Sequence, residues 1–379
     1  MERDIREAAS TFSCSGCGAR PVWDPSARDL RCPYCGAHTA VDMDRTAPAE
    51  YDILTAPTGK ALEWGEAKHV VRCQGCGAQT ILGPGESATL CAFCGSPHVL
   101  DDQSAAGIAP ESVIPFQVPQ DTAVSSFRRW LKGKFFAPSK AKKMAMLGQI
   151  TGVYLPHWTY DSDTVSRYTG QEGHYYYVDV PVQVNRNGKI VTEMRRERRT
   201  RWVPTSGIVA QRFDDVLISG SERLPENLLN AVRPYDLGGL CRYRAAFLSG
   251  FTAEKAGVDV QQGWKRAQAP IENEMRNLAR MDILRRADEA QVSGLFTDHS
   301  NVRYKLTLLP MYISSFTYKQ KHYHVLVNGQ SGKVGGQSPV SALRVALVVL
   351  SAIGLALLFY WLFMNGGQQD TTFIVSSYP

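Results

Sequence analysis

The pattern of apolar and polar positions separates the C-terminal end from the rest of the chain. Val345 to Met364 is an uninterrupted apolar run of 20 residues without a charge. A helix of that length extends about 30 Å, which matches the hydrocarbon core of a bilayer. A helix buried in a soluble core would normally carry a polar face, which this run lacks. The sequence therefore predicts one transmembrane helix over 343–364 and a short tail over 365–379.

Charged residues are unequally distributed around this run. Between 319 and 344 there are four cations and no acid, whereas Asp370 is the only charged residue after the run. By the positive-inside rule, we expect a single-pass protein of the cell (inner) membrane whose N-terminal bulk is cytoplasmic. Residues 1–7 alternate in charge and contain no apolar run, so we expect no secretory signal peptide there.

The middle of the chain, 111–338, mixes helical and strand periodicity. Helical spacing of apolar residues predicts helices over 121–135, 139–147, 225–232 and 271–290. Alternation and aromatic or β-branched residues predict strands over 152–155, 174–184, 190–202, 304–309, 312–318 and 322–327. Asn187-Gly188 and Asn328-Gly329 are typical of tight turns. Because hairpins outnumber regular strand–helix–strand units, the pattern indicates a central α+β domain with antiparallel hairpins.

Two short motifs in this region resemble each other. Leu155-Pro156-His157-Trp158 and Leu309-Pro310-Met311-Tyr312 both precede an aromatic-rich strand that leads to an Asn-Gly turn. One interpretation is that the central domain contains two copies of a half-domain. The other is chance similarity over four residues.

The N-terminal quarter contains a clear internal repeat. Eight of the nine cysteines form four Cys-x-x-Cys pairs, and the second set lies 59 residues after the first. Each unit begins Cys-x-Gly-Cys-Gly-Ala and ends Cys-x-x-Cys-Gly, with fourteen residues between its two cysteine pairs. The eight cysteines are Cys14, Cys17, Cys32 and Cys35, and then Cys73, Cys76, Cys91 and Cys94.

Cysteine pairs at this spacing are typical of zinc ribbons. Four thiolates fill a tetrahedral Zn²⁺ site at about 2.3 Å and leave no open position, so the metal is structural rather than catalytic. A single redox pair or a haem-attachment motif would need a different context, and glycine stands where haem attachment requires histidine. Ribbons of this size cannot build a core, so metal binding must supply folding free energy on the order of 10 kcal/mol. We predict two structural Zn²⁺ ions and a multidomain chain, with ribbons over 1–44 and 69–102 joined by a linker over 45–68.

The ninth cysteine and two nearby histidines have other expected roles. Cys241 lies in an apolar stretch and is expected to be a small buried residue rather than a ligand. His38 and His98 follow the last cysteine of each ribbon, but four thiolates suffice, so surface positions are expected. Reduced, metal-bound cysteines fit the cytoplasmic orientation that the apolar run predicts.

Composition adds little beyond these motifs. A chain of 379 residues with 44% hydrophobic content can bury one sizeable core beside small modules. The net charge of +6 favours no particular partner, but two basic runs stand out, Arg128 to Lys143 and Arg195 to Arg201. Each run has three interpretations: a solvated face, a surface for anionic lipid beside the membrane anchor, or a nucleic-acid contact.

The chain resembles a family of bacterial double-zinc-ribbon membrane proteins, described as of the transcription factor IIB type or as similar to primosomal protein N′. The resemblance includes both ribbons and the apolar run, together with Ile114-Pro115-Phe116, Gly152-Val153-Tyr154-Leu155-Pro156 and Val327-Asn328-Gly329-Gln330. His157 departs from the aromatic residue usual in the family. The resemblance implies this architecture and no particular activity.

No catalytic motif accompanies the ribbons. The sequence contains no Gly-x-Ser-x-Gly, no phosphate-binding loop and no His-Glu-x-x-His. We therefore predict a non-enzymatic, membrane-anchored, zinc-binding scaffold or adaptor on the cytoplasmic face, which binds protein partners through the ribbons and the central domain. The alternatives are a membrane-tethered nucleic-acid-binding protein and an enzyme of unknown reaction in the central domain.

Overall fold

The structure is a computed structural model that describes residues 13–46, 48–56, 69–73, 76–82, 91–94, 99–104, 108–147, 150–186 and 189–365. The turn expected at Asn187-Gly188, the residue His98 and the tail from 366 onwards lie outside these ranges. Within them, two tetracysteine modules precede a body made of a large mixed β-sheet with helices, and one long apolar helix follows it.

The first ribbon is a small sheet of its own. Its strands are β1 (Val22–Asp24), β2 (Asp29–Arg31) and β3 (His38–Thr39), and they pair antiparallel in that order. A short antiparallel hairpin, β1–β2, therefore lies between the two cysteine pairs. In the second ribbon, β6 (Gln79–Leu82) pairs instead with the preceding β5 (His69–Arg72).

Twelve of the described strands join in one mixed sheet. The sheet includes strands of the second ribbon as well as those of the body. Besides β5 and β6, its strands are β4 (Tyr51–Asp52), β7 (Val99–Ser104), β8 (Ser112–Val113), β9 (Ile150–Arg186), β10 (Lys189–Ser219), β11 (Cys241–Arg242), β12 (Thr252–Glu254), β13 (Glu289–Tyr318), β14 (Lys321–Asn328) and β15 (Val334–Gly336). The helices are α2 (Gln120–Lys132), α3 (Ser139–Leu147), α4 (Glu226–Val232), α5 (Val260–Leu284) and α6 (Ala342–Asn365), with short 3₁₀ turns η1 (Ile53–Thr55), η2 (Leu237–Gly239) and η3 (Ala245–Leu248).

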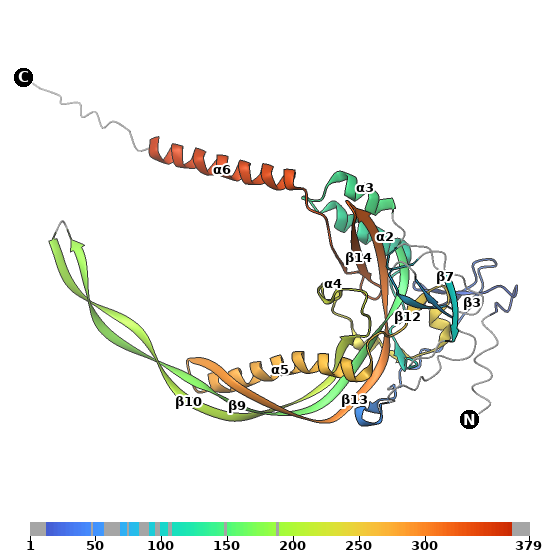
Figure 1. Cartoon of the computed structure of the whole chain (residues 1–379), viewed down its shortest axis with the longest axis horizontal. Coiled ribbons are helices and arrows are strands. Elements are labelled where there is room, and N and C mark those ends of the chain that lie inside the picture. Colours follow the sequence, from blue (N-terminus) through green and yellow to red (C-terminus); the bar gives the residue numbers. More distant parts are fainter. Residues whose placement is uncertain are drawn as a thin grey trace, which may run out of the picture.

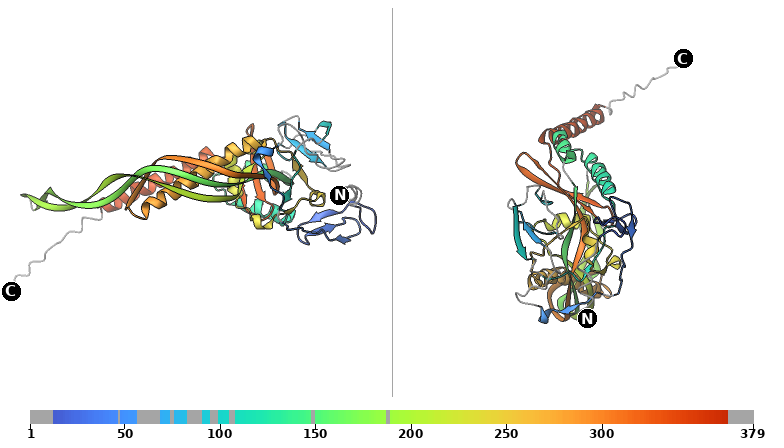
Figure 2. Two further views of the ribbon diagram at one scale, coloured as in Figure 1. Left: turned by 90° about the horizontal axis from the view of Figure 1, so that it is seen from below. Right: turned by 90° about the vertical axis from the view of Figure 1, so that its right-hand side faces the viewer.

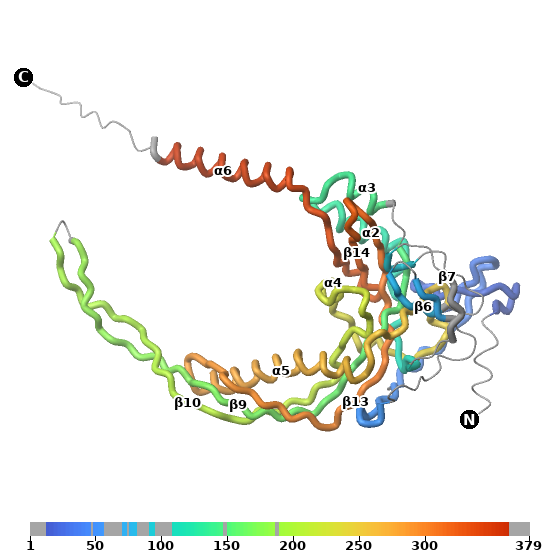
Figure 3. The backbone as a smooth tube through the Cα atoms, viewed as in Figure 1, coloured from blue at the N-terminus to red at the C-terminus, as the bar shows by residue number. Residues whose placement is uncertain are grey.

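A long curved projection leaves the body (Figure 1). Its stem has three strands, because β10 and β13 both pair with β9 until Glu289 lies opposite Gly173. Beyond that point only β9 and β10 continue, as a two-stranded ribbon over 174–186 and 189–201. We call this ribbon the arm. The figures show the arm and α6 leaving the body in the same general direction (Figures 1 and 3).

Helix α5 covers the stem of this projection. Its buried side chains recur at every fourth position, from Ala267 through Ile271, Met275 and Ala279 to Ile283, and form one face against the sheet. Asp259 caps its first turn by accepting a hydrogen bond from the Gln262 N–H at 2.8 Å.

Several predicted elements are corrected by the structure. The helix expected over 271–290 begins at Val260, contains Pro270 and ends at Leu284. The strands expected over 304–309 and 312–318 are one strand, β13, which starts at Glu289 and continues through Pro310. Likewise 152–155 and 174–184 belong to the single strand β9. The strand expected over 190–202 continues to Ser219 as β10.

The body is built from two similar halves. In each half a short strand leads through a loop into a helix, then into a long strand that returns as a hairpin. The elements are β8, α2, β9 and β10 in the first half, and β12, α5, β13 and β14 in the second; the first half has an additional helix, α3, between α2 and β9. Each short strand pairs in parallel with the long strand of the other half: Val113 lies opposite Leu308, and Ala253 lies opposite Tyr154.

Hydrogen bonds around the two Leu-Pro motifs repeat in the same way. The Pro156 carbonyl accepts from the Gly220 N–H at 2.8 Å, and the Pro310 carbonyl accepts from the Gly329 N–H at 2.9 Å. Each glycine carbonyl then accepts two N–H groups from the loop before a helix, those of Gly257 and Val258 for Gly220, and those of Gln117 and Val118 for Gly329. This repetition supports the half-domain interpretation. The returning strands differ greatly in length, 31 residues in β10 against 8 in β14.

The C-terminal helix projects away from the body. The segment Ala342–Phe363 is long and apolar enough to cross a membrane, with a mean hydropathy of 2.5, and none of its most apolar stretch is buried against other residues. Figure 2 shows it beside the body rather than packed within it. The structure thus provides one candidate membrane span.

Candidate metal centres

The first tetracysteine group is assembled by two tight turns. In each turn the N–H of the glycine that directly follows the second cysteine binds the carbonyl of the first cysteine: the Gly18 N–H binds the Cys14 carbonyl at 2.8 Å, and the Gly36 N–H binds the Cys32 carbonyl at 3.0 Å. Both glycines have positive φ, +72° and +74°, which explains why the motif places glycine there. The sulfur pairs Cys14–Cys35 and Cys17–Cys32 are separated by 3.4 and 3.5 Å.

The second group has the same construction. The Gly77 N–H binds the Cys73 carbonyl at 2.8 Å, with a φ of +71° at Gly77. The sulfur pairs Cys73–Cys94 and Cys76–Cys91 are separated by 3.5 and 3.7 Å. In each group all four sulfur atoms lie within 4.8 Å of one another.

The geometry of both groups fits a tetrahedral ion such as zinc. Four sulfurs at about 2.3 Å from a common centre lie about 3.8 Å apart, close to the separations in both groups. Backbone amides favour the thiolate form of two cysteines in the first group, whereas neighbouring thiols raise the pKa of Cys17 and Cys35. The N–H groups of Cys35 and then Tyr34 lower the pKa of Cys32 to about 6, and those of Gly16 and Cys17 lower the pKa of Cys14. The structure therefore brings all eight predicted ligands together as two sites compatible with structural metal ions.

Trp23 attaches the first ribbon to the body. Its indole Nε1 donates to the Phe116 carbonyl at 2.9 Å, and its ring meets Phe247 edge-on at 5.2 Å between centroids. Its backbone N–H binds the Ser249 carbonyl at 3.0 Å. Since Trp23 is buried, folding of this ribbon is coupled to packing of the body.

The second ribbon is attached by strand pairing and by one arginine. Strand β6 pairs antiparallel with β12, with Thr80 opposite Glu254. The Arg223 guanidinium donates to the carbonyls of Cys76 and Gly77 at 2.8 and 2.7 Å. The metal site therefore lies directly against the body rather than on a free module.

A buried charge cluster was not predicted from the sequence. Carboxylates of Glu50, Asp161 and Asp215 lie within 4.8 Å of one another, and the Lys305 ammonium pairs with two of them, 2.9 Å from Glu50 and 2.6 Å from Asp215. Burial raises the pKa of Asp161 to about 7. The two paired carboxylates raise the pKa of Lys305 against the effect of its burial. Through Lys305, this cluster holds the segment 48–56 against the body.

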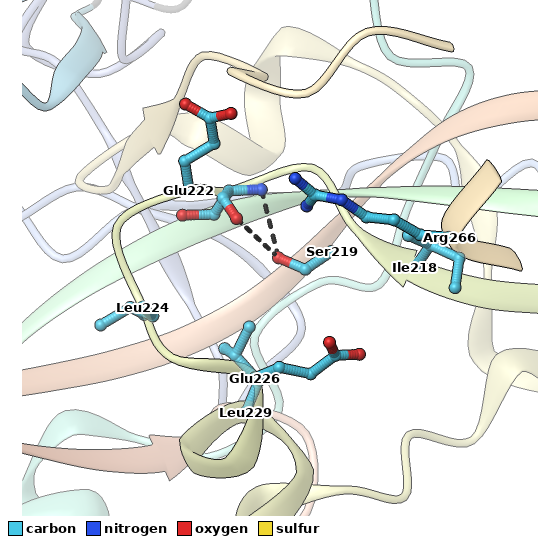
Figure 4. A pocket seen from close by; sticks show the side chains of 8 residues that line it. Ile218, Ser219, Glu222, Leu224, Glu226, Leu229 and Arg266 are labelled. Atoms are coloured by element: carbon cyan, nitrogen blue, oxygen red, sulfur yellow. Dashed lines mark hydrogen bonds between the residues drawn. The ribbon is translucent and has the colours of Figure 1, made fainter. Parts of the chain in front are cut away.

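A small pocket lies at the end of β10. It has a volume of about 230 Å³ and includes Ser219, Ser221, Glu222 and Arg266 among its lining residues (Figure 4). The Ser221 hydroxyl donates to the Glu254 carboxyl at 2.9 Å. Burial raises the pKa of Glu254 to about 8, so this carboxyl is protonated at neutral pH and is a poor base for the serine. The pair therefore stabilises the turn rather than forming a nucleophile and base.

Other residues singled out in the sequence occupy the expected surroundings. Cys241 is buried, its thiol lies 3.4 Å from the Val113 carbonyl, and burial raises its pKa to about 11. His38 is exposed and pairs with the Asp29 carboxylate at 2.8 Å. The basic run from Arg195 to Arg201 lies on β10 in the arm, where Arg196 and Arg198 cover the rings of Tyr177 and Tyr175 at 4.4 and 4.2 Å.

Taken together, fold and sites define a class of protein with two tetracysteine metal sites, a mixed-sheet body with a long arm, and one apolar C-terminal helix. Comparison with known proteins finds a similarity that extends over nearly the whole chain. The chain is similar to the uncharacterized protein YdjG of Bacillus subtilis (strain 168), with 26% identity over 367 residues that cover 94% of this chain and 99% of the relative. No family model matches the chain, and no solved structure matches it. This similarity extends over nearly the full length of both chains, whereas the family name expected above rests on the sequence motifs alone.

Proposed function

We propose that the protein is a membrane-anchored, zinc-binding scaffold that holds protein partners at the cytoplasmic face of the cell membrane. Helix α6 would be the anchor, and the two zinc ribbons would brace the body. The arm would be the element that partners contact. An enzymatic role is not part of this proposal.

The observation that supports this proposal is the difference between the two halves of the body. Both halves use the same strand–helix–hairpin plan, but only the first extends its hairpin into the arm. Among the described residues, no third strand pairs with the arm beyond Gly173, and its outer side chains, such as Ile190 and Met194, are exposed. Two-stranded ribbons are marginally stable by themselves. A long ribbon with exposed apolar and charged residues is typical of a surface that another molecule covers.

Affinity purification from detergent-solubilised membranes, followed by mass spectrometry, tests the proposal. The matched variant removes 176–199 and joins Tyr175 to Thr200, which are register partners, through an Asn-Gly turn. We expect the intact chain to retain a reproducible set of proteins that the shortened chain loses, with both chains still binding two zinc ions. Purification of the intact chain alone, or an identical set from both chains, contradicts the proposal.

Nucleic-acid binding is a second candidate because arginines and tyrosines interleave on the arm. Five arginines fall between 195 and 201, and two of them stack on tyrosine rings. Arginine and aromatic faces together suit single-stranded nucleic acid. If this function is correct, the logarithm of the binding constant falls steeply with the logarithm of salt concentration, and replacing arm arginines with glutamine reduces that slope. Absence of binding at low salt contradicts it.

A further inference from the structure

The start of α6 is fixed to the turn between α2 and α3. The Arg344 guanidinium donates to the carbonyls of Phe135 and Ala137, both at 2.7 Å, and to the Ser139 hydroxyl at 2.8 Å. The Ser341 N–H also binds the Phe136 carbonyl at 2.9 Å. This turn, far from α6 in sequence, therefore lies where the apolar helix leaves the body (Figure 1).

Two aromatic side chains are exposed at this position. Phe135 is 64% exposed and Phe136 is 40% exposed, and their rings meet edge to face at 5.3 Å between centroids. Leu343, in the first turn of α6, is also exposed. Exposed apolar side chains beside the start of a membrane span suit the bilayer interface, where an apolar body and polar surroundings meet.

Cations surround these phenylalanines without any acid. The segment 128–143, which we call the basic collar, contains seven lysines and arginines and no aspartate or glutamate. Two of them have partners inside the collar, since Lys142 donates to the Lys132 carbonyl at 3.1 Å and Lys134 lies over the Trp130 ring at 4.4 Å. Within the described part of the chain, none of the seven forms an ion pair with a carboxylate.

Helix geometry places the remaining cations outward. On α2, Ala123, Phe127 and Leu131 are buried, so Arg128, Arg129 and Lys132 lie on the opposite, exposed side. On α3, Lys140 and Lys143 are exposed.

We infer that the basic collar is a second membrane contact, in which Phe135 and Phe136 enter the interface and the surrounding cations bind anionic lipid headgroups. The inference rests on the proposed membrane anchoring by α6. Charge complementarity with an anionic leaflet and continuity with the span both favour a lipid surface. An acidic protein would neutralise the cations but would not account for the two phenylalanines at the foot of the span.

Hydrogen–deuterium exchange of the full chain in vesicles tests this contact. We expect peptides covering 128–147 to exchange more slowly in vesicles rich in phosphatidylglycerol than in vesicles of phosphatidylcholine alone. Salt at about 1 M shortens the Debye length to about 3 Å and should remove the difference. Replacing Lys132, Lys140 and Lys143 with glutamine should weaken docking by about fivefold per cation, and Phe135→Ser should weaken it further.

The matched control replaces three arginines of the arm, Arg195, Arg199 and Arg201, with glutamine, which removes the same charge elsewhere and should leave collar exchange unchanged. Equal collar exchange in both kinds of vesicle, with α6 protected in each, overturns the collar contact and leaves the anchor standing. A chain whose α6 remains unprotected in both kinds of vesicle overturns the anchoring itself, and the collar contact with it.

Discussion

The metal ligands are positioned mainly by their own backbone turns. The carbonyls of Cys14, Cys32 and Cys73 each accept a hydrogen bond from the N–H of the glycine four residues later. The N–H of each of these cysteines donates to the carbonyl of the alanine that follows this glycine, Ala19, Ala37 or Ala78. These paired bonds close the same turn three times. Backbone turns place the four sulfurs, so no neighbouring side chain is positioned to take the place of a lost sulfur. Loss of one cysteine should therefore release the ion.

Replacing Cys32 with serine should therefore remove one of the two metal ions. Without the ion, the first ribbon loses most of its folding free energy, and Trp23 leaves its buried site against Phe116 and Phe247. Elemental analysis should give one zinc per chain instead of two, and tryptophan emission should shift to the red. Cys241→Ser is the matched control and should retain two. Two zinc ions in the Cys32→Ser chain, or fewer than two in the unmodified chain, would contradict this assignment.

Glu254 makes stability depend on pH. Burial raises its pKa to about 8 in the folded protein, above its ordinary value of 4.5, so the folded state holds a proton that the unfolded state releases between these values. The contribution of Glu254 to the free energy of unfolding is fully present below pH 4.5. It falls as pH rises toward 8, with a slope of up to about 1.4 kcal/mol per pH unit.

The variant Glu254→Gln should remove this contribution. Denaturant unfolding between pH 5 and 8 should show a flatter decline for the variant than for the unmodified chain, and the variant should be the more stable of the two at pH 8. Comparing the two chains at each pH cancels the pH dependence of metal binding, which they share. Parallel stability curves would show that Glu254 is ionised in the folded protein.

Among the structural elements, the β9–β13 pair requires close backbone approach. A Cβ at Gly170 would overlap the Gln291 carbonyl oxygen, at a point where the register of β13 shifts between Val292 and Gly294. Gly170→Ala should therefore lower the free energy of unfolding by about 1–3 kcal/mol, as overpacking usually does. Gly133→Ala is the control, because Gly133 has helical φ and a Cβ there meets only ordinary contacts. Thermal unfolding of both variants measures the difference, and equal midpoints would contradict it.

The elements that were predicted well are those with an apolar stripe or a special residue at the turn. Helix α2 and the cysteine turns fall in this group, because Phe127 and Leu131 mark a buried face and Gly18 marks a positive φ. Strand β9 was predicted in fragments because its buried positions under α5 include small hydroxyl residues. Thr164 donates to the Gln211 carbonyl at 2.6 Å and Ser166 bonds Thr297 at 2.7 Å, so these buried positions look polar in sequence.

The two tetracysteine groups were likewise predicted from local spacing alone, whereas the Glu50–Asp161–Asp215–Lys305 cluster was not. Its members come from four segments that are far apart in the sequence. They meet because β4 pairs with β13 and because the pairing of β10 with β9 shifts register at Asp215. No periodicity in sequence marks such a meeting. The same holds for Arg344, whose partners lie in the α2–α3 turn about two hundred residues earlier.

For the whole molecule, the proposed anchoring by α6 requires that the arm and α6 occupy different surroundings. Figure 1 shows both leaving the body in the same direction, yet the arm carries five arginines between 195 and 201. Each would cost at least about 2.5 kcal/mol at the centre of a bilayer, so the arm stays in water. The hydrogen bonds that join α6 to the described body all come from Ser341 and Arg344. These bonds therefore fix the place where α6 leaves the body.

This separation predicts that the arm lies on the same side of the membrane as the ribbons. In a Met194→Cys chain, whose new side chain replaces one that is 65% exposed on the arm, a membrane-impermeant maleimide should add label only after the cells are permeabilised. A Gln368→Cys chain, altered beyond the span, should gain label in intact cells. Label on the variant beyond that on the unmodified chain comes from the new thiol, since Cys241 is buried and the other cysteines would be held by metal. Labelling of Met194→Cys in intact cells would place the arm outside and reverse the orientation proposed for the whole chain.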